Sequence, residues 1–202
     1  MEVAMKVYGD IRSGNCYKLK LVMSILEIPH SWVVVDILSG ETKATEFLAL
    51  NPNGKIPVLE LPDGRCLSES NAIVNYLAAG SELLPTDYFE LAKVQQWQFF
   101  EQYSHEPFIA VARFIAKFLQ LPDERRDEYE SKQNGGHKAL AIMEEQLAHE
   151  EYLVGGRLST ADISLYAYTH VADEGGFDLA QYPAVQRWLA RIKKHPNYAG
   201  MT

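Results

Sequence analysis

The chain has 202 residues, of which 47% are hydrophobic and 23% are charged. These are the proportions of an ordinary globular protein, and they exclude a wholly disordered or fibrous chain. The excess of 27 acidic over 19 basic residues gives a net charge of −8, which argues against a basic nucleic-acid-binding surface. The two cysteines, Cys16 and Cys66, are too few for a secreted disulfide scaffold and too far apart for a paired CxxC motif.

The chain shows no sign of targeting or metal binding. Its first fifteen residues lack a continuous apolar segment, and it has no run of about 18 apolar residues that could span a membrane. The six histidines are scattered, without the paired spacing of a metal site. We therefore expect a cytoplasmic protein without a membrane partner or a bound metal.

The first 80 residues mix strand and helix patterns. We expect strands over 5–8, 32–35, 56–61 and 65–67, and helices over 13–27, 45–50 and 71–79. The β-branched run at 32–35 predicts a buried strand, and Pro62-Asp63-Gly64 predicts a turn between the last two strands. The order βαβαββα predicts a mixed sheet, in which the first two strands are parallel and the last two form a hairpin.

Strand patterns vanish after a linker at 80–87. We expect one long helix over 89–119, kinked before Pro107, then helical segments over 123–149, 159–173 and 183–195. Asn134-Gly135-Gly136 is a possible break in the second of these segments, and the charge run at 124–130 predicts a solvated helix face. The expected domains are residues 1–80 and residues 88–202.

A turn-rich loop at 51–55 enters the third strand through the Ile56–Pro57 bond. A proline at a strand start gives up its own N–H, and a cis bond there would leave the Ile56 backbone unpaired by the sheet. Such an edge can bind a peptide-like ligand as an added strand. The pattern alone favours a plain loop with a trans proline, because cis bonds are only about 5–6% of X–Pro bonds.

Two further segments place polar side chains at helix starts. Ser70 predicts an N-cap, where backbone donors also attract a carboxylate, and Glu69 beside it could bind an amine. Together they suit an α-amino-acid head group. In the turn after the first strand, Ser13 is either a cap or a donor to an anion. Cys16 is either a thiol whose pKa the helix start lowers or a small buried apolar residue.

These segments together resemble one family. NPNGKIPVLE at 51–60, SESNAIVNYL at 68–77 and the all-helical second half are similar to the cytosolic glutathione transferases, over nearly the whole chain. GRLSTADI at 156–163 is similar to that family's buried helix start, where Ser159 and Asp162 cap reciprocally. The resemblance is to serine-type bacterial members of the theta, phi or nu kind. It implies an α/β thioredoxin-like N-terminal domain followed by an all-α C-terminal domain.

The resemblance implies a glutathione site in the first domain. Ile56, before the Pro57 that resembles the family's cis-proline, would bind the cysteinyl unit through its backbone. Glu69 and Ser70 match positions that bind the γ-glutamyl group. Lys43 looks like the basic residue that meets the glycyl carboxylate, and Lys55 is a weaker candidate for the same part of the ligand.

Ser13 matches the serine that donates a hydrogen bond to the glutathione sulfur, which would favour the thiolate and lower the pKa of the thiol. Asn15 lies in the same turn and could replace the serine as donor. Cys16 lies near the cysteine that forms mixed disulfides in other members of the family.

The implied function is conjugation of glutathione, as co-substrate and without another cofactor, to small hydrophobic electrophiles in detoxification. Tyr103, His105 and Arg113 are the candidates for the electrophile pocket, and the family pairs two chains as a homodimer. Two alternatives remain open. One is a glutathione-dependent thiol transferase or disulfide reductase that uses Cys16, and the other is a non-catalytic binding relative of the fold.

Overall fold

The structure is a computed structural model that describes residues 5–201. The chain divides into two compact units. The α/β unit contains the residues up to Ser81 together with those from Pro196 onward, and the helical unit contains Glu82–His195. Within residues 5–201, no helix combines the length and the apolar character that crossing a membrane requires.

The α/β unit has the predicted order of elements. They are β1 (Met5–Gly9), α1 (Gly14–Ile25), β2 (His30–Val34), η1 (Glu41–Lys43), α2 (Thr45–Leu50), β3 (Val58–Glu60), β4 (Cys66–Ser68) and α3 (Ser70–Ala78). The strands form one sheet in the order β2-β1-β3-β4. β1 is parallel to β2 and antiparallel to β3, and β3 is antiparallel to β4. The predicted mixed sheet with its hairpin is therefore confirmed.

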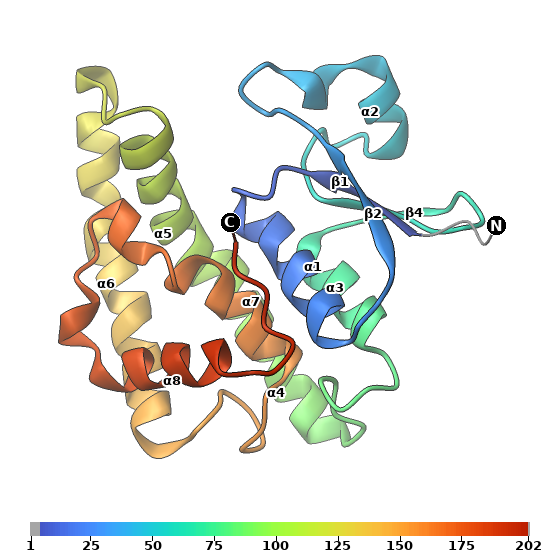
Figure 1. Ribbon diagram of the computed structural model, residues 1–202. Helices are drawn as coiled ribbons and strands as arrows, with labels where there is room; N and C mark the ends of the chain where they lie inside the picture. Colours follow the sequence, from blue (N-terminus) through green and yellow to red (C-terminus); the bar gives the residue numbers. More distant parts are fainter. Residues whose placement is uncertain (1–4, 202) are drawn as a thin grey trace. The chain divides into compact units, whose positions relative to one another are not determined.

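The two faces of this sheet are covered by different helices. Successive side chains of β1 point to opposite faces. A Cβ atom on Gly9 would lie 2.5 Å from the Cys16 sulfur, so this face of β1 carries α1, which packs beside α3 (Figure 1). Tyr8 points to the other face, where it packs against a buried cluster that includes Phe47 of α2 and Val58 of β3.

The prediction that 32–35 is a buried strand is wrong. β2 lies at an edge of the sheet and pairs only with β1. Its residue Val34 is 73% exposed. Val35, which follows the strand, is buried against Phe47 of α2. The β-branched run indicates extended backbone but not burial. Whether a strand is buried depends on the helices that cover it, and these lie elsewhere in the sequence.

The helical unit begins with a continuous helical stretch over 88–118, as predicted. It consists of α4 (Tyr88–Phe100), η2 (Glu101–His105), α5 (Glu106–Arg113) and η3 (Phe114–Phe118), and η2 and η3 are π-helical turns. η2 ends two residues before Pro107, which has no N–H for the regular helical ladder. The remaining elements are η4 (Asp123–Arg125), α6 (Arg126–His149), α7 (Thr160–Thr169), η5 (Ala172–Gly175), η6 (Leu179–Gln181) and α8 (Pro183–Lys193).

The possible break at 134–136 is wrong, because α6 runs unbroken from Arg126 to His149. Packing explains why glycines stand there. A Cβ atom on Gly135 would lie 2.2 Å from the ring of Phe108, and one on Gly136 would lie 2.2 Å from the ring of Phe177. The glycine pair thus lets two aromatic rings approach the helix backbone.

The start of α7 contains the predicted reciprocal cap. The Asp162 carboxylate is fully buried and accepts hydrogen bonds from the backbone N–H and the hydroxyl of Ser159, at 2.9 and 2.8 Å. It also accepts from the Leu153 N–H and from the Trp188 indole N–H, both at 2.9 Å. One side chain therefore ties the start of α7 to α8 and to the loop that precedes α7.

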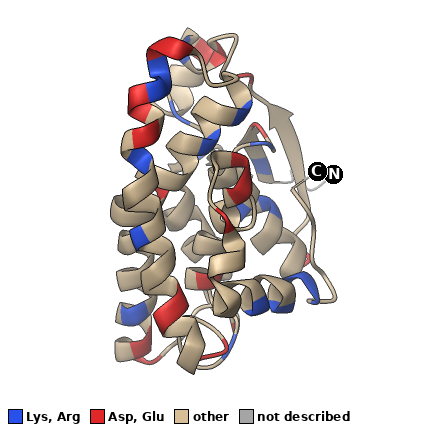
Figure 2. Ribbon diagram, turned by 90° about the vertical axis from the view of Figure 1, so that its left-hand side faces the viewer, with Lys and Arg blue, Asp and Glu red and all other residues tan. Residues whose placement is uncertain are grey.

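The charge run around 124–130 behaves as predicted for a solvated face. Ion pairs join Arg125 to Glu128 and Arg126 to Asp123, three residues apart in each case. Figure 2 shows both signs of charge interspersed along the helices. Pairs of this exposed kind contribute little to stability, so this surface serves mainly to keep the helix hydrated.

We expect Gly136→Ala to lower the free energy of unfolding by about 1–2 kcal/mol, because the new methyl group overpacks against Phe177. Urea unfolding followed by circular dichroism measures this change. Ala141→Gly at an exposed position of the same helix is the control, and helix propensity predicts that it too is destabilising, by about 1 kcal/mol. A Gly136→Ala protein more stable than the wild type by about 1 kcal/mol, the gain that helix propensity alone predicts, would contradict the packing explanation.

Asp162→Ala is expected to be the more severe change. It should lower the free energy of unfolding by about 3–5 kcal/mol, because it leaves several buried donors without an acceptor. The same unfolding experiment tests it against Asp178→Ala. Asp178 is exposed and accepts one hydrogen bond, from the Ala180 N–H. That control should lose only about 1 kcal/mol. Equal losses in the two variants would refute the role given to Asp162.

Candidate functional site

The turn between β1 and α1 presents Ser13 at the start of a helix. Arg12 forms a bidentate ion pair with Asp10, and the Ser13 N–H donates to the Asp10 carbonyl at 2.9 Å. Ser13 occupies the N-cap position of α1, but its hydroxyl makes no capping hydrogen bond to the helix. Its hydrogen-bond partner is the thiol of Cys16. The hydroxyl therefore lies at the positive end of the α1 dipole without being used as a cap.

Cys16 does not have the lowered thiol pKa that its position in the first turn suggests. The side chain is fully buried. Burial raises the pKa of Cys16 to about 12, and hydrogen bonds from Ser13 and from the Asp10 backbone oppose this shift only in part. The alternative of a small buried apolar residue fits the structure, and the helix-dipole expectation for the thiol is wrong.

Asn15, Lys18 and Ser70 form a hydrogen-bonded group between α1 and α3. The Lys18 ammonium donates to the Ser70 hydroxyl at 3.2 Å, and that hydroxyl donates to Oδ1 of Asn15 at 3.1 Å. Lys18 is 0% exposed, and Ser70 is also buried. Lys18 was not among the candidates from sequence. The available signal was a lysine inside the apolar run of α1, between Tyr17 and Leu19.

The start of α3 differs from the expected cap. Glu69 is the N-cap residue and Ser70 is the first helical residue, so the Ser70 hydroxyl does not cap its own helix. Glu69 has φ = 68°, a left-handed conformation that few non-glycine residues adopt, and its side chain is exposed. Such strained residues cluster at ligand sites. The arrangement places a carboxylate in solvent directly beside the first N–H groups of α3.

The Ile56–Pro57 bond is cis, as the resemblance implies and against the pattern-based preference for trans. β3 pairs with β1 only from Val58 onward, so the sheet leaves the Ile56 backbone outside its ladder. The preceding loop is held by Asn51, whose side-chain amide donates to the Lys55 carbonyl at 2.7 Å. The same side chain accepts from the Asn53 N–H at 3.1 Å. The edge predicted to bind an extended ligand is therefore present.

The two lysine candidates for a ligand carboxylate lie on the same loop region. A Cβ atom on Gly54 would be 3.0 Å from the Lys43 ammonium, so Lys43 reaches from η1 across the loop before Pro57. Lys55 is exposed, and its backbone carbonyl, not its side chain, has the contact with Asn51. Lys43 is thus the cation that is positioned by the fold.

Tyr8 is unsuited to activating a thiol. Its hydroxyl donates to the Glu60 carboxylate at 2.5 Å. This hydrogen bond, together with burial, raises the pKa of Tyr8 to about 12. The same contact, with a second one from Lys6, holds the pKa of Glu60 below its usual value. The Tyr8 side chain therefore packs on the sheet face that carries α2 and is bonded there to Glu60.

The three candidates for the electrophile pocket have different environments. Tyr103 is 87% exposed, on η2. His105 is fully buried and hydrogen-bonds the Thr169 hydroxyl through Nε2 at 2.9 Å. Arg113 is buried and pairs with Glu174 at 2.6 Å. The expectation that His105 and Arg113 line a pocket is therefore corrected, because both side chains are enclosed and bonded within the helical unit.

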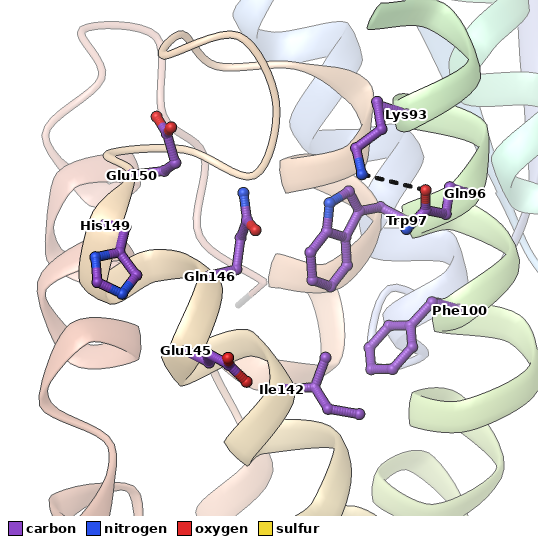
Figure 3. A pocket seen from close by; sticks show the side chains of 9 residues that line it. All are labelled: Lys93, Gln96, Trp97, Phe100, Ile142, Glu145, Gln146, His149 and Glu150. Atoms are coloured by element: carbon purple, nitrogen blue, oxygen red, sulfur yellow. Dashed lines mark hydrogen bonds between the residues drawn. The ribbon is translucent and has the colours of Figure 1, made fainter. Parts of the chain in front are cut away.

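A hollow of about 430 Å³ lies between α4 and the end of α6 (Figure 3). Its lining residues are Lys93, Gln96, Trp97, Phe100, Ile142, Glu145, Gln146, His149 and Glu150. None of the three electrophile candidates is among them. The described residues contain no cluster of side chains suited to holding a metal ion.

Comparison with known proteins agrees with this geometry. The N-terminal domain of glutathione S-transferase matches residues 12–79, and its C-terminal domain matches residues 99–196. The solved structure of a glutathione S-transferase from Pseudomonas fluorescens Pf-5 is 60% identical, covers 98% of both chains and superposes with a TM-score of 0.96.

More distant relatives have other names. A probable maleylacetoacetate isomerase from Vibrio cholerae is 28% identical over 98% of this chain and 94% of its own length. Protein URE2 from Meyerozyma guilliermondii is 27% identical over 94% of this chain and 76% of its own. The domain matches and the 60% identity carry the assignment: the chain belongs to the glutathione S-transferase family, as a glutathione transferase.

Proposed function

We propose that this protein conjugates the thiolate of glutathione to small hydrophobic electrophiles, with Ser13 as the donor to the sulfur. The observation that carries the proposal is the Ser13 hydroxyl, which stands at the start of α1 and makes no cap there. Because a helix start carries positive potential, a sulfur beside Ser13 is favoured as thiolate. Each unit by which the pKa of the thiol falls is worth about 1.4 kcal/mol of preference for the reactive form.

Other groups of the α/β unit would bind the three units of glutathione. The backbone of Ile56 is available to the cysteinyl unit, since the sheet does not pair it. Glu69 and Ser70 suit the amine and carboxylate of the γ-glutamyl unit, and Lys43 suits the glycyl carboxylate. Fixing the thiol by its flanking groups lowers the entropic part of the barrier. The enzyme then needs no covalent step, because glutathione itself is the nucleophile.

The disulfide-reductase alternative would require Cys16 to attack as a thiolate. Its full burial and raised pKa both oppose this chemistry. Cys66 is exposed on β4, with a raised pKa of its own. Among the described residues, the hydroxyl of Ser13 and the amide of Asn15 are therefore the better candidates for the group that meets the glutathione sulfur.

Ser13→Ala is expected to raise the pKa of the thiol of bound glutathione. It should also lower kcat/KM for an activated aryl halide by about 100-fold, the usual effect of losing one donor to a developing anion. Ultraviolet absorbance of the thiolate, followed against pH in the complex, measures the first effect. Asn15→Ala is the control and should keep the low thiol pKa. If Ser13→Ala kept it as well and Asn15→Ala lost it, the donor would be Asn15. No affinity of the wild type for glutathione would refute the whole proposal and favour a binding relative of the fold.

Cys16 is expected to be inert in the native protein. An aromatic disulfide reagent should modify Cys66 within minutes and Cys16 only after the chain is unfolded, because burial suppresses the thiolate at neutral pH. Cys66→Ser is the matched variant and should show no rapid reaction. Cys16→Ser should retain conjugating activity. Rapid labelling of Cys16, or loss of activity in Cys16→Ser together with retention in Ser13→Ala, would establish the disulfide route instead.

A further inference from the structure

β2 leaves the backbone of its outer edge open. Among residues 5–201, the strand pairs with β1 alone. The Val35 N–H, just after the strand, donates to the Gly9 carbonyl of β1 at 3.3 Å. Since successive residues of a strand direct their N–H and C=O groups to opposite edges, Trp32 and Val34 direct theirs away from β1. An edge of this kind can accept an extended peptide as a further strand.

Exposed apolar side chains are concentrated on this strand and on the loop that follows it. Val33, Val34, Ile37 and Leu38 are four of the five exposed large hydrophobic side chains among the described residues of the α/β unit. Val33 and Val34 are consecutive in the strand, so they point to opposite faces of the sheet. A strand added beside β2 would therefore meet apolar surface on both of its faces. Exposed apolar patches of this kind commonly mark binding sites.

The opposite edge of the sheet is protected against such pairing. Natural sheets discourage it with short edge strands and with charged side chains or proline on the edge. β4 has only three residues, and the exposed Arg65 precedes it directly. β2 has five residues, and none of them is a lysine, an arginine, a carboxylate or a proline. The edge at β2 is therefore the one whose sequence permits an added strand.

The charged side chains that flank β2 in the chain are acidic. Segment 21–42 contains Glu27, Asp36 and Glu41 and neither lysine nor arginine. Glu27 precedes the strand, whereas Asp36 and Glu41 follow it. Pairing of two copies through β2 would bring these acids together, and like charges across an interface oppose association. A peptide with basic residues beyond an apolar centre is the complementary partner.

A hollow of about 430 Å³ begins at Val35, where β2 ends. Phe47 of α2 is part of its apolar wall, and its charged lining residues, Glu41 and Glu46, are both acidic. The Glu41 carboxylate accepts the Asp36 N–H at 2.7 Å. Because lysine and arginine have an apolar stem and a charged head, either can lie along such a wall and reach the carboxylates. The hollow thus suits a basic side chain of a peptide bound at the edge.

We propose that β2 accepts an extended peptide of a partner protein as a fifth strand of the sheet. The apolar centre of the peptide lies against Val33 and Val34, and a basic residue beyond it enters the hollow that contains Glu41 and Glu46. Backbone pairing supplies affinity, whereas the apolar pair and the acids supply specificity. The surface shares no residue with the proposed glutathione site, so the inference does not depend on the proposed function.

Short synthetic peptides serve as probes. The first is acetylated and has two valines at its centre, two threonines on each side and a lysine at each end. A second has glutamate at both ends, and a third has the first sequence with N-methyl groups on its central backbone nitrogens. Binding to the full-length protein labelled with ¹⁵N is followed from its backbone amide signals. Only backbone pairing requires the nitrogens that the third peptide blocks.

We expect the lysine peptide to shift the amide signals of Trp32 and Val34 and to slow their hydrogen exchange. It should bind about tenfold more tightly than the glutamate peptide, because the acids near β2 attract the one and repel the other. The N-methylated peptide should not bind. Failure of the lysine peptide to bind, or equal binding of the N-methylated peptide, would overturn the proposal.

Val34→Lys introduces on β2 the side chain with which natural edge strands prevent pairing, and it should weaken binding of the lysine peptide by about tenfold or more. Cys66→Lys is the matched control, because Cys66 is exposed on the opposite edge strand. That variant should bind the peptide as the wild type does. Val34 is 73% exposed, so circular dichroism should show an unchanged fold in Val34→Lys. Wild-type affinity in Val34→Lys would contradict the role of the edge.

The double variant Glu41→Gln/Glu46→Gln tests the hollow. Glutamine keeps an acceptor for the Asp36 N–H, so only the charge is removed. Affinity for the lysine peptide should fall by about fivefold, and affinity for a peptide with glutamine at both ends should not change. Equal changes for the two peptides would refute the charge recognition. Amide signals of Trp32 and Val34 that depend on protein concentration without peptide would show that a second copy occupies the edge, and would also overturn the proposal.

Discussion

The α/β unit depends on how closely α1 approaches β1. The strand carries glycine at the point of contact, since a Cβ atom on Gly9 would meet the Cys16 sulfur at 2.5 Å. The Trp32 indole N–H donates to the Gly9 carbonyl at 2.9 Å and fixes the strand from its β2 side. The short separation has two consequences. It encloses the thiol of Cys16 between strand and helix, and it brings the first turn of α1 up to the end of β1, where Ser13 begins the helix.

The division of labour among the polar residues of α1 follows from that contact. The residues of α1 that face the sheet are shielded from solvent. Burial raises the pKa of the Cys16 thiol and so favours its neutral form. Ser13, at the end of the helix, remains partly exposed. Lys18 lies a turn further on and reaches α3 instead of solvent, through Ser70. The three polar residues of this segment therefore differ because of how deeply each is buried and which element its side chain faces.

The sequence predicted correctly those features that depend on local periodicity or on short motifs whose physical role is known. The strand and helix order, the hairpin at Pro62-Asp63-Gly64 and the reciprocal cap of Ser159 and Asp162 are all present. These features are encoded by residues close together in the chain, so no knowledge of distant partners is needed.

The failures have a common physical origin in partners that are remote in sequence. Gly135 and Gly136 suggested a break, yet they accommodate the rings of Phe108 and Phe177, which come from other elements. Ser70 has the composition of a cap, but its hydroxyl bonds Asn15 and Lys18, more than fifty residues earlier. His105 was predicted to line a pocket because the sequence does not show its partner. That partner is the hydroxyl of Thr169, 64 positions later in the chain. The resemblance, not periodicity, anticipated the cis bond before Pro57.

The acidic chain and its anionic ligand are compatible because electrostatic recognition here is local. Glutathione carries two carboxylates and one ammonium, and in the proposed site these face Lys43, the start of α3 and the Glu69 carboxylate. The net charge of −8 is a sum over all 202 residues. Salt screens exposed charges beyond about 8 Å at physiological ionic strength, so most of that charge acts weakly at the site. The Lys43 ammonium and the first N–H groups of α3 would meet the ligand at contact distance, so they can outweigh carboxylates that lie much farther away.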